Sequence, residues 1–461
     1  MVDVASDSNC YGLLKDSGVE SLGVIPQHWK TSRFRNLFSF DKGLNITKDN
    51  LQDTGIPCIN YGEVHSRFGF EISPDNHTLK CVHEEFLKNN PNSLLRIGDF
   101  IFADTSEDID GSGNFSQLTG GELVFAGYHT IIARPINRCA KRFLAYMLDS
   151  VAFRDQVRRA VKGVKVYSIT KSILKETSVW LPPTAEQELI SDYLDRKLVN
   201  ANHAIQIKER QIERLKERKQ ILIQKAVTRG INPLAPMRNS GIEWIGEIPT
   251  HWETVRLKYL FKEINERSKT GEETLLSLRM ELGLVPHDDV SDKAISNESL
   301  VDYKIVRPGQ MVMNRMRAAI GIFGVSSRLG LVSPDYAIFD IKERANPSFF
   351  LRLFKLPLLG TQFRLGSKGL GTGSSGFMRL YTQDFGDIKV AVPPLGEQLE
   401  ILQFIDSTSE RIDNACTLFE QQITRLKEYK ATLINSAVTG KIKVPGVVEP
   451  DSGKCLPPLA G

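Results

Sequence analysis

An internal duplication constrains this chain more than any other feature. Residues 17–29 recur as residues 240–252, with eight identities in 13 positions. Residues 182–228 recur without a gap as residues 393–439, and 20 of those 47 positions are identical. Unrelated sequences of average composition would share about three. A chain of 461 residues with this pattern is therefore built from two copies of one structural plan.

The repeated segments enclose two divergent inserts, residues 30–181 (the first insert) and residues 253–392 (the second insert), which share little sequence. One short pattern occurs in both inserts, because residues 96–101 and 307–312 each predict a turn that leads into a strand. Each insert combines strand-like and helical patterns, which predicts a mixed α/β module. The strand-like runs are 99–103, 130–133, 310–313 and 336–339, and the helical patterns are 141–161 and 347–366.

The second repeated segment predicts a long helix in each copy. Pro182-Pro183 and Pro393-Pro394 favour an extended lead-in, and no proline or glycine follows Glu186 before Gly230, or Glu397 before Gly440. Apolar residues then recur at alternating steps of seven and three or four residues, the pattern of a coiled coil. The predicted pairing positions are Leu194, Ala201, Ile205, Ile212, Leu215 and Leu222 in the first copy and Ile405, Ile412, Ile423, Leu426 and Leu433 in the second. Because a module separates the helices in the chain, we expect them to pair antiparallel. We also expect the end of the second helix, near Thr439, to return to the opening segment at residues 18–29.

The common catalytic motifs are absent from this sequence. The sequence has no phosphate-binding loop with the spacing that nucleotides require, no Gly-x-Ser-x-Gly nucleophile turn, and no Asn/Asp-Pro-Pro-aromatic motif of the kind that clamps a flipped base. The one catalytic site for which the sequence offers suitable residues is that of a metal-dependent nuclease. It would use Asp335 and Asp340 with Lys342, although their spacing is short and the first insert has no counterpart.

Clusters of cations are more informative, since Arg and Lys contact phosphates and recognise base edges. The net charge of +4 permits a nucleic-acid partner without requiring one. The candidate DNA-binding residues are Arg158, Arg159, Lys162 and Lys165 in the first insert and Arg315, Arg317, Lys368 and Arg379 in the second.

No apolar run reaches the length of a membrane span, and the six cysteines are scattered without a Cys-x-x-Cys pair. We therefore expect a reduced, cytoplasmic protein without a metal site.

Three duplicated motifs together resemble the specificity subunits of type I restriction–modification enzymes. They are the Ile-Pro-x-His-Trp openings, the Pro-Pro-x-x-Glu-Gln helix entries, and the Arg-Leu-Lys-Glu and Ala-Val-Thr helix ends. The resemblance covers nearly the whole chain. It implies an α+β fold in which two globular mixed α/β target-recognition domains are separated by two long helices, which pair as an antiparallel coiled coil with a pseudo-twofold internal repeat. The implied domains are 1–183 and 231–394, the helices 184–230 and 395–443, and the tail 444–461.

The resemblance also implies a function. Each target-recognition domain would recognise one half of a bipartite double-stranded DNA site, and the helices would set the distance between the halves. The chain itself would be non-catalytic and bind no cofactor. Two methyltransferase subunits and the restriction (motor and nuclease) subunits would dock on it, bringing S-adenosylmethionine, ATP and Mg²⁺. The alternatives are a stand-alone metal-dependent endonuclease and a specificity subunit of a methyltransferase-only system.

Overall fold

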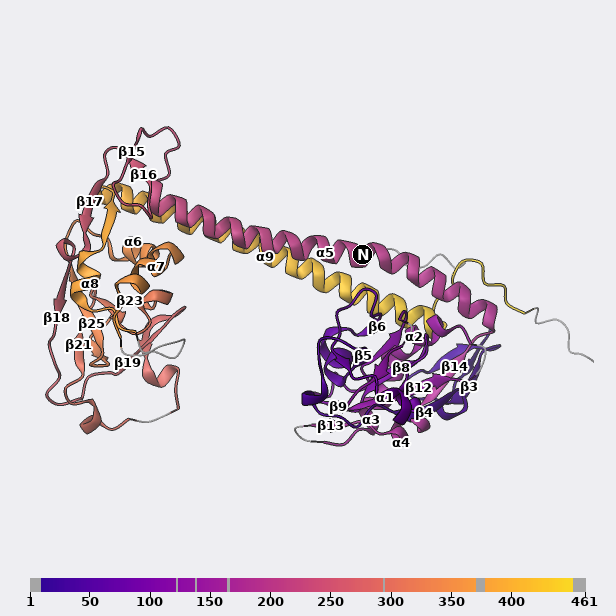
Figure 1. Cartoon of the computed structure of the whole chain (residues 1–461). Helices are drawn as coiled ribbons and strands as arrows, with labels where there is room; N and C mark the ends of the chain where they lie inside the picture. Colours follow the sequence, from indigo (N-terminus) through magenta and orange to yellow (C-terminus); the bar gives the residue numbers. More distant parts are fainter. Residues whose placement is uncertain are drawn as a thin grey trace, which may run out of the picture. The chain divides into compact units, whose positions relative to one another are not determined.

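The computed structural model describes residues 10–121, 123–136, 139–163, 166–292, 295–369 and 378–450. The chain forms two compact units. Unit 1 contains residues 1–208 and 421–461, and unit 2 contains residues 209–420. Two long helices, α5 (Thr184–Arg229, 46 residues) and α9 (Leu395–Val438, 44 residues), contribute residues to both units (Figure 1).

Unit 1 is built on a five-stranded sheet in the order β4-β12-β8-β10-β6, in which only the β10–β6 pair is parallel. A second sheet has the order β11-β5-β7, and three two-stranded ladders complete the unit: β1-β2, β14-β3 and β13-β9. The strands are β1 (Leu14–Asp16), β2 (Val24–Pro26), β3 (Lys30–Arg33), β4 (Phe38–Lys42), β5 (Ile56–Ile59), β6 (Phe70–Ile72), β7 (Cys81–Val82), β8 (Phe100–Ala103), β9 (Thr105–Ser106), β10 (Phe115–Leu118), β11 (Phe125–Ala126), β12 (Thr130–Pro135), β13 (Tyr167–Ser168) and β14 (Ser178–Leu181). The helices are α1 (Phe86–Asn89), α2 (Lys141–Asp149), α3 (Val151–Ala160), α4 (Lys171–Glu176) and the start of α5.

Unit 2 has a four-stranded antiparallel sheet in the order β18-β25-β22-β23. Four ladders surround it: β15-β16, β17-β26, β19-β20 and β21-β24. The strands are β15 (Met237–Asn239), β16 (Glu247–Pro249), β17 (Glu253–Arg256), β18 (Phe261–Ile264), β19 (Leu276–Arg279), β20 (Gly283–Pro286), β21 (Lys304–Val306), β22 (Met311–Asn314), β23 (Phe323–Val325), β24 (Gly330–Val332), β25 (Tyr336–Ile341) and β26 (Lys389–Val392). The helices are α6 (Pro347–Phe354), α7 (Pro357–Gly366) and α8 (Thr382–Asp387).

The two inserts share one sheet plan despite their divergent sequences. Strands β4, β12, β8 and β10 pair in the same order as β18, β25, β22 and β23. The predicted turn before the central strand is present in both copies. The Asp99 carboxylate accepts the N–H of Arg96 at 2.9 Å, and the Gln310 amide oxygen accepts the N–H of Arg307 at 2.7 Å. The predicted α+β fold with an internal repeat is confirmed.

The helical pattern of each insert forms two short helices instead of one. In the first insert, Ser150 is extended and its hydroxyl caps α3 by accepting the N–H of Phe153. In the second insert, Leu356 is extended because Pro357 follows it. A capping serine and a proline therefore divide what apolar periodicity alone predicted as continuous helices.

The predicted antiparallel helix pairing is confirmed within each unit. In unit 1, Lys208 of α5 donates to Gln422 of α9 at 2.5 Å, and in unit 2 Lys219 forms an ion pair with Asp413 at 2.7 Å. Figure 1 shows the yellow end of α9 running beside α5. Of the predicted pairing positions, Leu194, Ala201, Ile205, Ile212, Ile405, Ile412, Ile423 and Leu433 are buried, and Leu215, Leu222 and Leu426 are half-buried.

The duplicated motifs contact each other at the start of each long helix. The Glu186 carboxylate accepts the Trp29 indole N–H at 3.0 Å, lies 2.7 Å from His28, and also accepts the Tyr11 hydroxyl. In unit 2, Glu397 accepts the Trp252 indole N–H at 3.0 Å and lies 2.7 Å from His251. The neighbouring glutamines bind main chain, because Gln187 accepts the N–H of Ala140 and Gln398 accepts that of Asn346. These repeated residues therefore fix each insert to a helix end.

The far end of each long helix packs on an opening segment of the same unit. Gly440 follows α9 in the left-handed conformation (φ +72°), and a Cβ there would lie 2.3 Å from Pro26. Gly230 follows α5 with φ +75°, and a Cβ there would lie 3.3 Å from Trp252. Only glycine combines this backbone angle with such close packing. The predicted return of the second helix to the first opening segment is confirmed.

Candidate nucleic-acid interface

In each insert, residues from several parts of the chain converge at one end of the central sheet. We call this the loop end. In the first insert it comprises residues 104–108, 128–129, 161–163 and 166–169. Strand β13 pairs with β9, Lys162 pairs with Ser168, and the N–H of Ile169 donates to the carbonyl of Asp104 at 2.8 Å. The segment after α3 is thereby held against the residues that follow β8.

The second insert repeats this arrangement. Its loop end comprises residues 315–320, 333–335, 366–369 and 378–380. Lys368 and Arg379 form the matching bridge, and the N–H of Leu380 donates to the carbonyl of Arg315 at 2.9 Å. Since β8 and β22 are equivalent strands, the two loop ends lie at the same place in the shared fold.

Four predicted DNA-binding residues belong to the first insert. Lys162 lies exposed in the loop end. Arg158 lies on α3, with its guanidinium 3.0 Å from the carbonyl of Asp110 and 3.5 Å from the Asp155 carboxylate. Arg159 points instead to the opening segment, where it forms an exposed ion pair with Glu20 at 2.8 Å. Lys165 lies outside the described residues.

All four predicted residues of the second insert lie in its loop end. Arg315 is three-quarters buried and bonded to Glu263 at 2.6 Å. Arg379 forms an ion pair with Asp335 at 3.3 Å, and Lys368 forms one with Asp384 at 2.5 Å. Arg317 is exposed, and within the described residues its guanidinium has no hydrogen bond or ion pair. The structure thus distinguishes cations that are neutralised internally from one that is available.

The loop end of the first insert borders a cleft of about 420 Å³ with a polar and aromatic lining. The lining residues are Tyr61, Gly62, His65, Ser66, Thr105, Glu107, His129 and Val166. His129 has a positive φ of 55°, and its ring lies 3.1 Å from the Asp104 carboxylate. Such a backbone costs energy in a residue other than glycine and is often found at functional sites.

A cleft of about 460 Å³ borders the loop end of the second insert. Its polar lining includes Arg279, His287, Asn314, Arg317 and Tyr336. Burial raises the pKa of Tyr336, and the nearby guanidiniums of Arg317 and Arg279 oppose this rise. Arg317, from the loop after β22, and Arg279, from strand β19, therefore both lie near the phenol of Tyr336.

The Tyr336 side of this cleft is supported from the interior. Lys304 is 3% exposed and donates to the carbonyl of Tyr336 at 2.7 Å. Burial lowers the pKa of Lys304, while Glu263, 3.6 Å away, raises it. Glu263 also binds Arg315, so one carboxylate holds two cations beneath the loop end.

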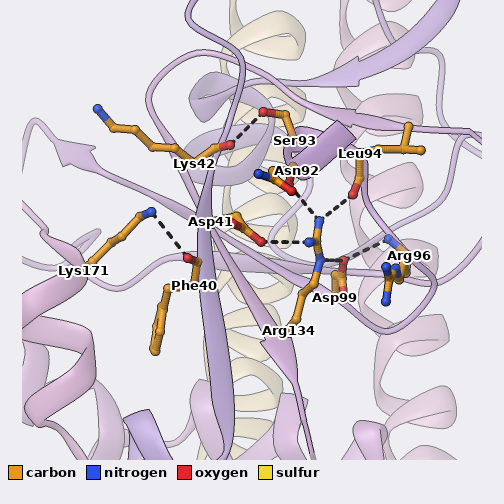
Figure 2. Close-up of polar contacts among 10 residues, drawn as sticks. All are labelled: Phe40, Asp41, Lys42, Asn92, Ser93, Leu94, Arg96, Asp99, Arg134 and Lys171. Carbon is orange, nitrogen blue, oxygen red and sulfur yellow. Dashed lines mark hydrogen bonds and ion pairs between the residues drawn. The ribbon is translucent and has the colours of Figure 1, made fainter. Parts of the chain in front are cut away.

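Figure 2 shows a contrasting arginine at the opposite end of the first sheet. Arg134 donates to the carboxylates of Asp41 at 2.8 Å and Asp99 at 2.9 Å. It also donates to the carbonyls of Asn92 at 2.9 Å and Leu94 at 2.5 Å. All these contacts are internal, so Arg134 stabilises the fold. In the second insert Gln310 donates to Asp340 at 2.7 Å at the equivalent position.

We expect Arg134→Met to destabilise the first insert by roughly 3–5 kcal/mol, because Asp99, 5% exposed, would remain buried without its cation. Hydrogen exchange of the β8 and β12 amides measures the local loss. Arg159→Met is the matched control, since its ion pair with Glu20 is exposed and such pairs contribute about 0–1 kcal/mol. Equal exchange rates in both variants would contradict this role of Arg134.

The two carboxylates of the alternative nuclease site have structural partners. Asp340 accepts a hydrogen bond from Gln310, and Asp335 pairs with Arg379. Across the described ranges, no group of three or more His, Cys, Asp or Glu side chains could hold a metal ion.

Part of the site could not be found in the sequence. The Arg315–Arg317 cluster was evident, but Arg279 enters the cleft only because β19 and β20 form a hairpin beside β24 and β23. Tyr61 and His65 lie four residues apart in one helical segment, whereas His129 comes from a distant segment, and no sequence spacing connects it with them.

Comparisons with known proteins show which family the chain resembles. Residues 26–217 match the family model described as Type I restriction modification DNA specificity domain. This part of the chain belongs to the family of type I DNA specificity domains. The family model spans the first insert, its helix entry and the greater part of α5.

Specificity subunits from two organisms resemble the chain. It is 20% identical to the type I restriction enzyme EcoKI specificity subunit of Escherichia coli over 92% of this chain and 91% of that one. It is 23% identical to the MjaVIII specificity subunit of Methanocaldococcus jannaschii over 65% and 70%, respectively. A solved chain, from a structure on complex assembly and conformational transition of the type I R-M system, matches with a TM-score of 0.62. That match has 17% identity and covers 90% of this chain and 98% of the solved one, so the two chains share a fold.

Two further observations concern the environment of the chain. None of the helices in the described part of the chain combines the length and apolar character needed to cross a membrane. Cys10, Cys58, Cys81, Cys139 and Cys416, the cysteines within the described residues, are free thiols.

Proposed function

We propose that this specificity subunit recognises a bipartite DNA sequence, with one half-site for each insert. The observation that carries the proposal is the combination of a shared sheet plan with divergent loop ends. The strand order and the contacts of the repeated motifs are the same in both copies, whereas the cations and aromatic residues of the loop ends differ. A common scaffold with different polar surfaces suits recognition of two different DNA words.

The chain acts in this proposal as the non-catalytic member of a complex. Two methyltransferase subunits bind it and supply S-adenosylmethionine for adenine methylation, and the restriction subunits supply the ATP- and Mg²⁺-dependent activities. The same chain would also serve a methyltransferase-only system. Resemblance to type I specificity subunits over nearly the whole chain supports this assignment.

The long helices set the distance between the half-sites in this proposal. Seven residues added after Lys208 in α5 and seven after Glu420 in α9 would preserve the coiled-coil register, because seven is one heptad. At 1.5 Å per residue the insertion lengthens each helix by about 10 Å, or roughly three base pairs at 3.4 Å each.

We therefore expect the non-specific spacer of the methylated motif to lengthen by about three base pairs, with both half-site words unchanged. Sequencing of methylated adenines in cells that carry the lengthened chain measures this. Conservative substitutions at the same two junctions, without insertion, provide the control. An unchanged spacer in a complex that still methylates would contradict the role of the helices.

A further inference from the structure

The cleft of the second insert differs in charge from that of the first. Its lining includes two arginines, Arg279 and Arg317, and one carboxylate, Asp335, which is paired with Arg379. Among the described residues that line the first cleft, none is Lys or Arg, and Glu107 adds a negative charge. The two clefts therefore suit different ligand surfaces although both border equivalent loop ends.

Arg279 and Arg317 are both exposed, and no carboxylate in the described residues neutralises either of them. Other arginines of the same insert, such as Arg315 and Arg379, are held by Glu263 and Asp335. Guanidinium groups carry hydrogen-bond donors and no acceptors. Two of them without a carboxylate partner therefore favour a ligand rich in hydrogen-bond acceptors.

The backbone beneath Arg317 is fixed before any ligand arrives. Asn314 is buried, and its side-chain oxygen accepts the N–H of Met316 at 3.1 Å and that of Arg317 at 3.2 Å. The following turn closes at Gly321, where φ is +80°. A pre-organised backbone lowers the entropy lost when the side chain binds.

A second polar group in the cleft also lacks a partner. Nδ1 of His287 lies 2.9 Å from the Ser277 hydroxyl. Its Nε2 is buried and, within the described residues, has no hydrogen bond. A buried polar atom without a partner is unfavourable unless a ligand or water satisfies it.

We propose that Arg317, assisted by Arg279, recognises a guanine in the half-site of the second insert. Guanine presents two acceptors, O6 and N7, in the major groove, and they match the paired donors of a guanidinium. No such donor pair is present among the described residues that line the first cleft, so the proposal concerns the second half-site alone. This inference rests on the proposed function, since it requires that the second insert contacts base edges.

A DNA phosphate is the other acceptor-rich ligand that an arginine could bind. A base contact and a phosphate contact differ in what changes when the contact is lost. Loss of a base contact relaxes specificity at one position, whereas loss of a phosphate contact weakens binding to all sequences and reduces its salt dependence.

The first experiment maps methylated adenines in cells that carry the complete complex with Arg317→Ala. We expect discrimination at one guanine of the second half-site to fall by about 5- to 150-fold, with the other half-site unchanged. Arg328→Ala is the matched control, because Arg328 is exposed in the same insert and does not line the cleft. An unchanged motif in the Arg317→Ala complex would overturn the inference.

The second experiment measures binding of the purified complex to duplexes in which that guanine is replaced by 7-deazaguanine, which lacks the N7 acceptor. The wild-type complex should lose affinity, and the Arg317→Ala complex should bind both duplexes equally. Uniform weakening by Arg317→Ala with a shallower salt dependence would overturn the inference in favour of a phosphate contact. A methylated motif that does not depend on this chain would instead refute the proposed function itself.

Discussion

Replacing residues 253–392 with the corresponding insert of another specificity subunit will change one half of the methylated motif and leave the other half unaltered. Strands β17 and β26 both lie inside the exchanged segment and pair with each other, so the exchange preserves their ladder. The contacts among His251, Trp252 and Glu397 lie outside it and remain native. Each base pair that no longer matches should cost about 1–3 kcal/mol, which is enough to abolish methylation at the former half-site.

The reciprocal exchange of residues 30–181 is the control, and it should change only the opposite half of the motif. Sequencing of methylated adenines in cells with each chimera measures both results. Simultaneous change of both halves in either chimera would show that the inserts do not recognise DNA independently.

A fragment that ends at Pro236 will form a homodimer. In unit 1, Leu194 of α5 packs in one core with Leu433 of α9. The repeat places Leu222 of α5 at the position of Leu433 in α9, so a second copy of the fragment offers an equivalent surface. Such an interface is isologous, with the same patch used on both sides. Together with the methyltransferase subunits, the dimer should methylate a palindrome built from the first half-site and its inverted repeat.

Analytical ultracentrifugation at micromolar concentrations measures the state of this fragment. The variant Ile212→Asp is the control, because a charge at a buried pairing position should leave the fragment monomeric. A folded wild-type fragment that remained monomeric would argue against pairing of equivalent helix surfaces.

The sequence predicted the repeated part of this protein better than the divergent part. Identities between the copies located both long helices, and a coiled-coil pattern located residues such as Ile405 and Ile412, which are buried. The sequence did not reveal why Glu186 and Glu397 recur. Their role depends on contacts with Trp29 and Trp252, which are distant in the chain.

The candidate interface was predictable only where several cations are adjacent in the sequence. Arg315 and Arg317 are two residues apart, yet one is bound by Glu263 and the other has no such partner among the described residues. Glu263 reaches Arg315 from strand β18, a contact that composition and charge runs do not encode. Arg279 enters the same cleft from another hairpin. Tertiary contacts therefore decide which cations are available to DNA.

Genome-wide sequencing of methylated adenines, in otherwise identical cells with and without this chain, tests the central claim most directly. The methyltransferase subunits are kept in both strains, so only the specificity subunit varies. We expect one bipartite motif, with two different half-sites and a fixed spacer, to be methylated only when the chain is present. An identical set of methylated adenines in both strains would contradict the claim that this chain selects the DNA sequence.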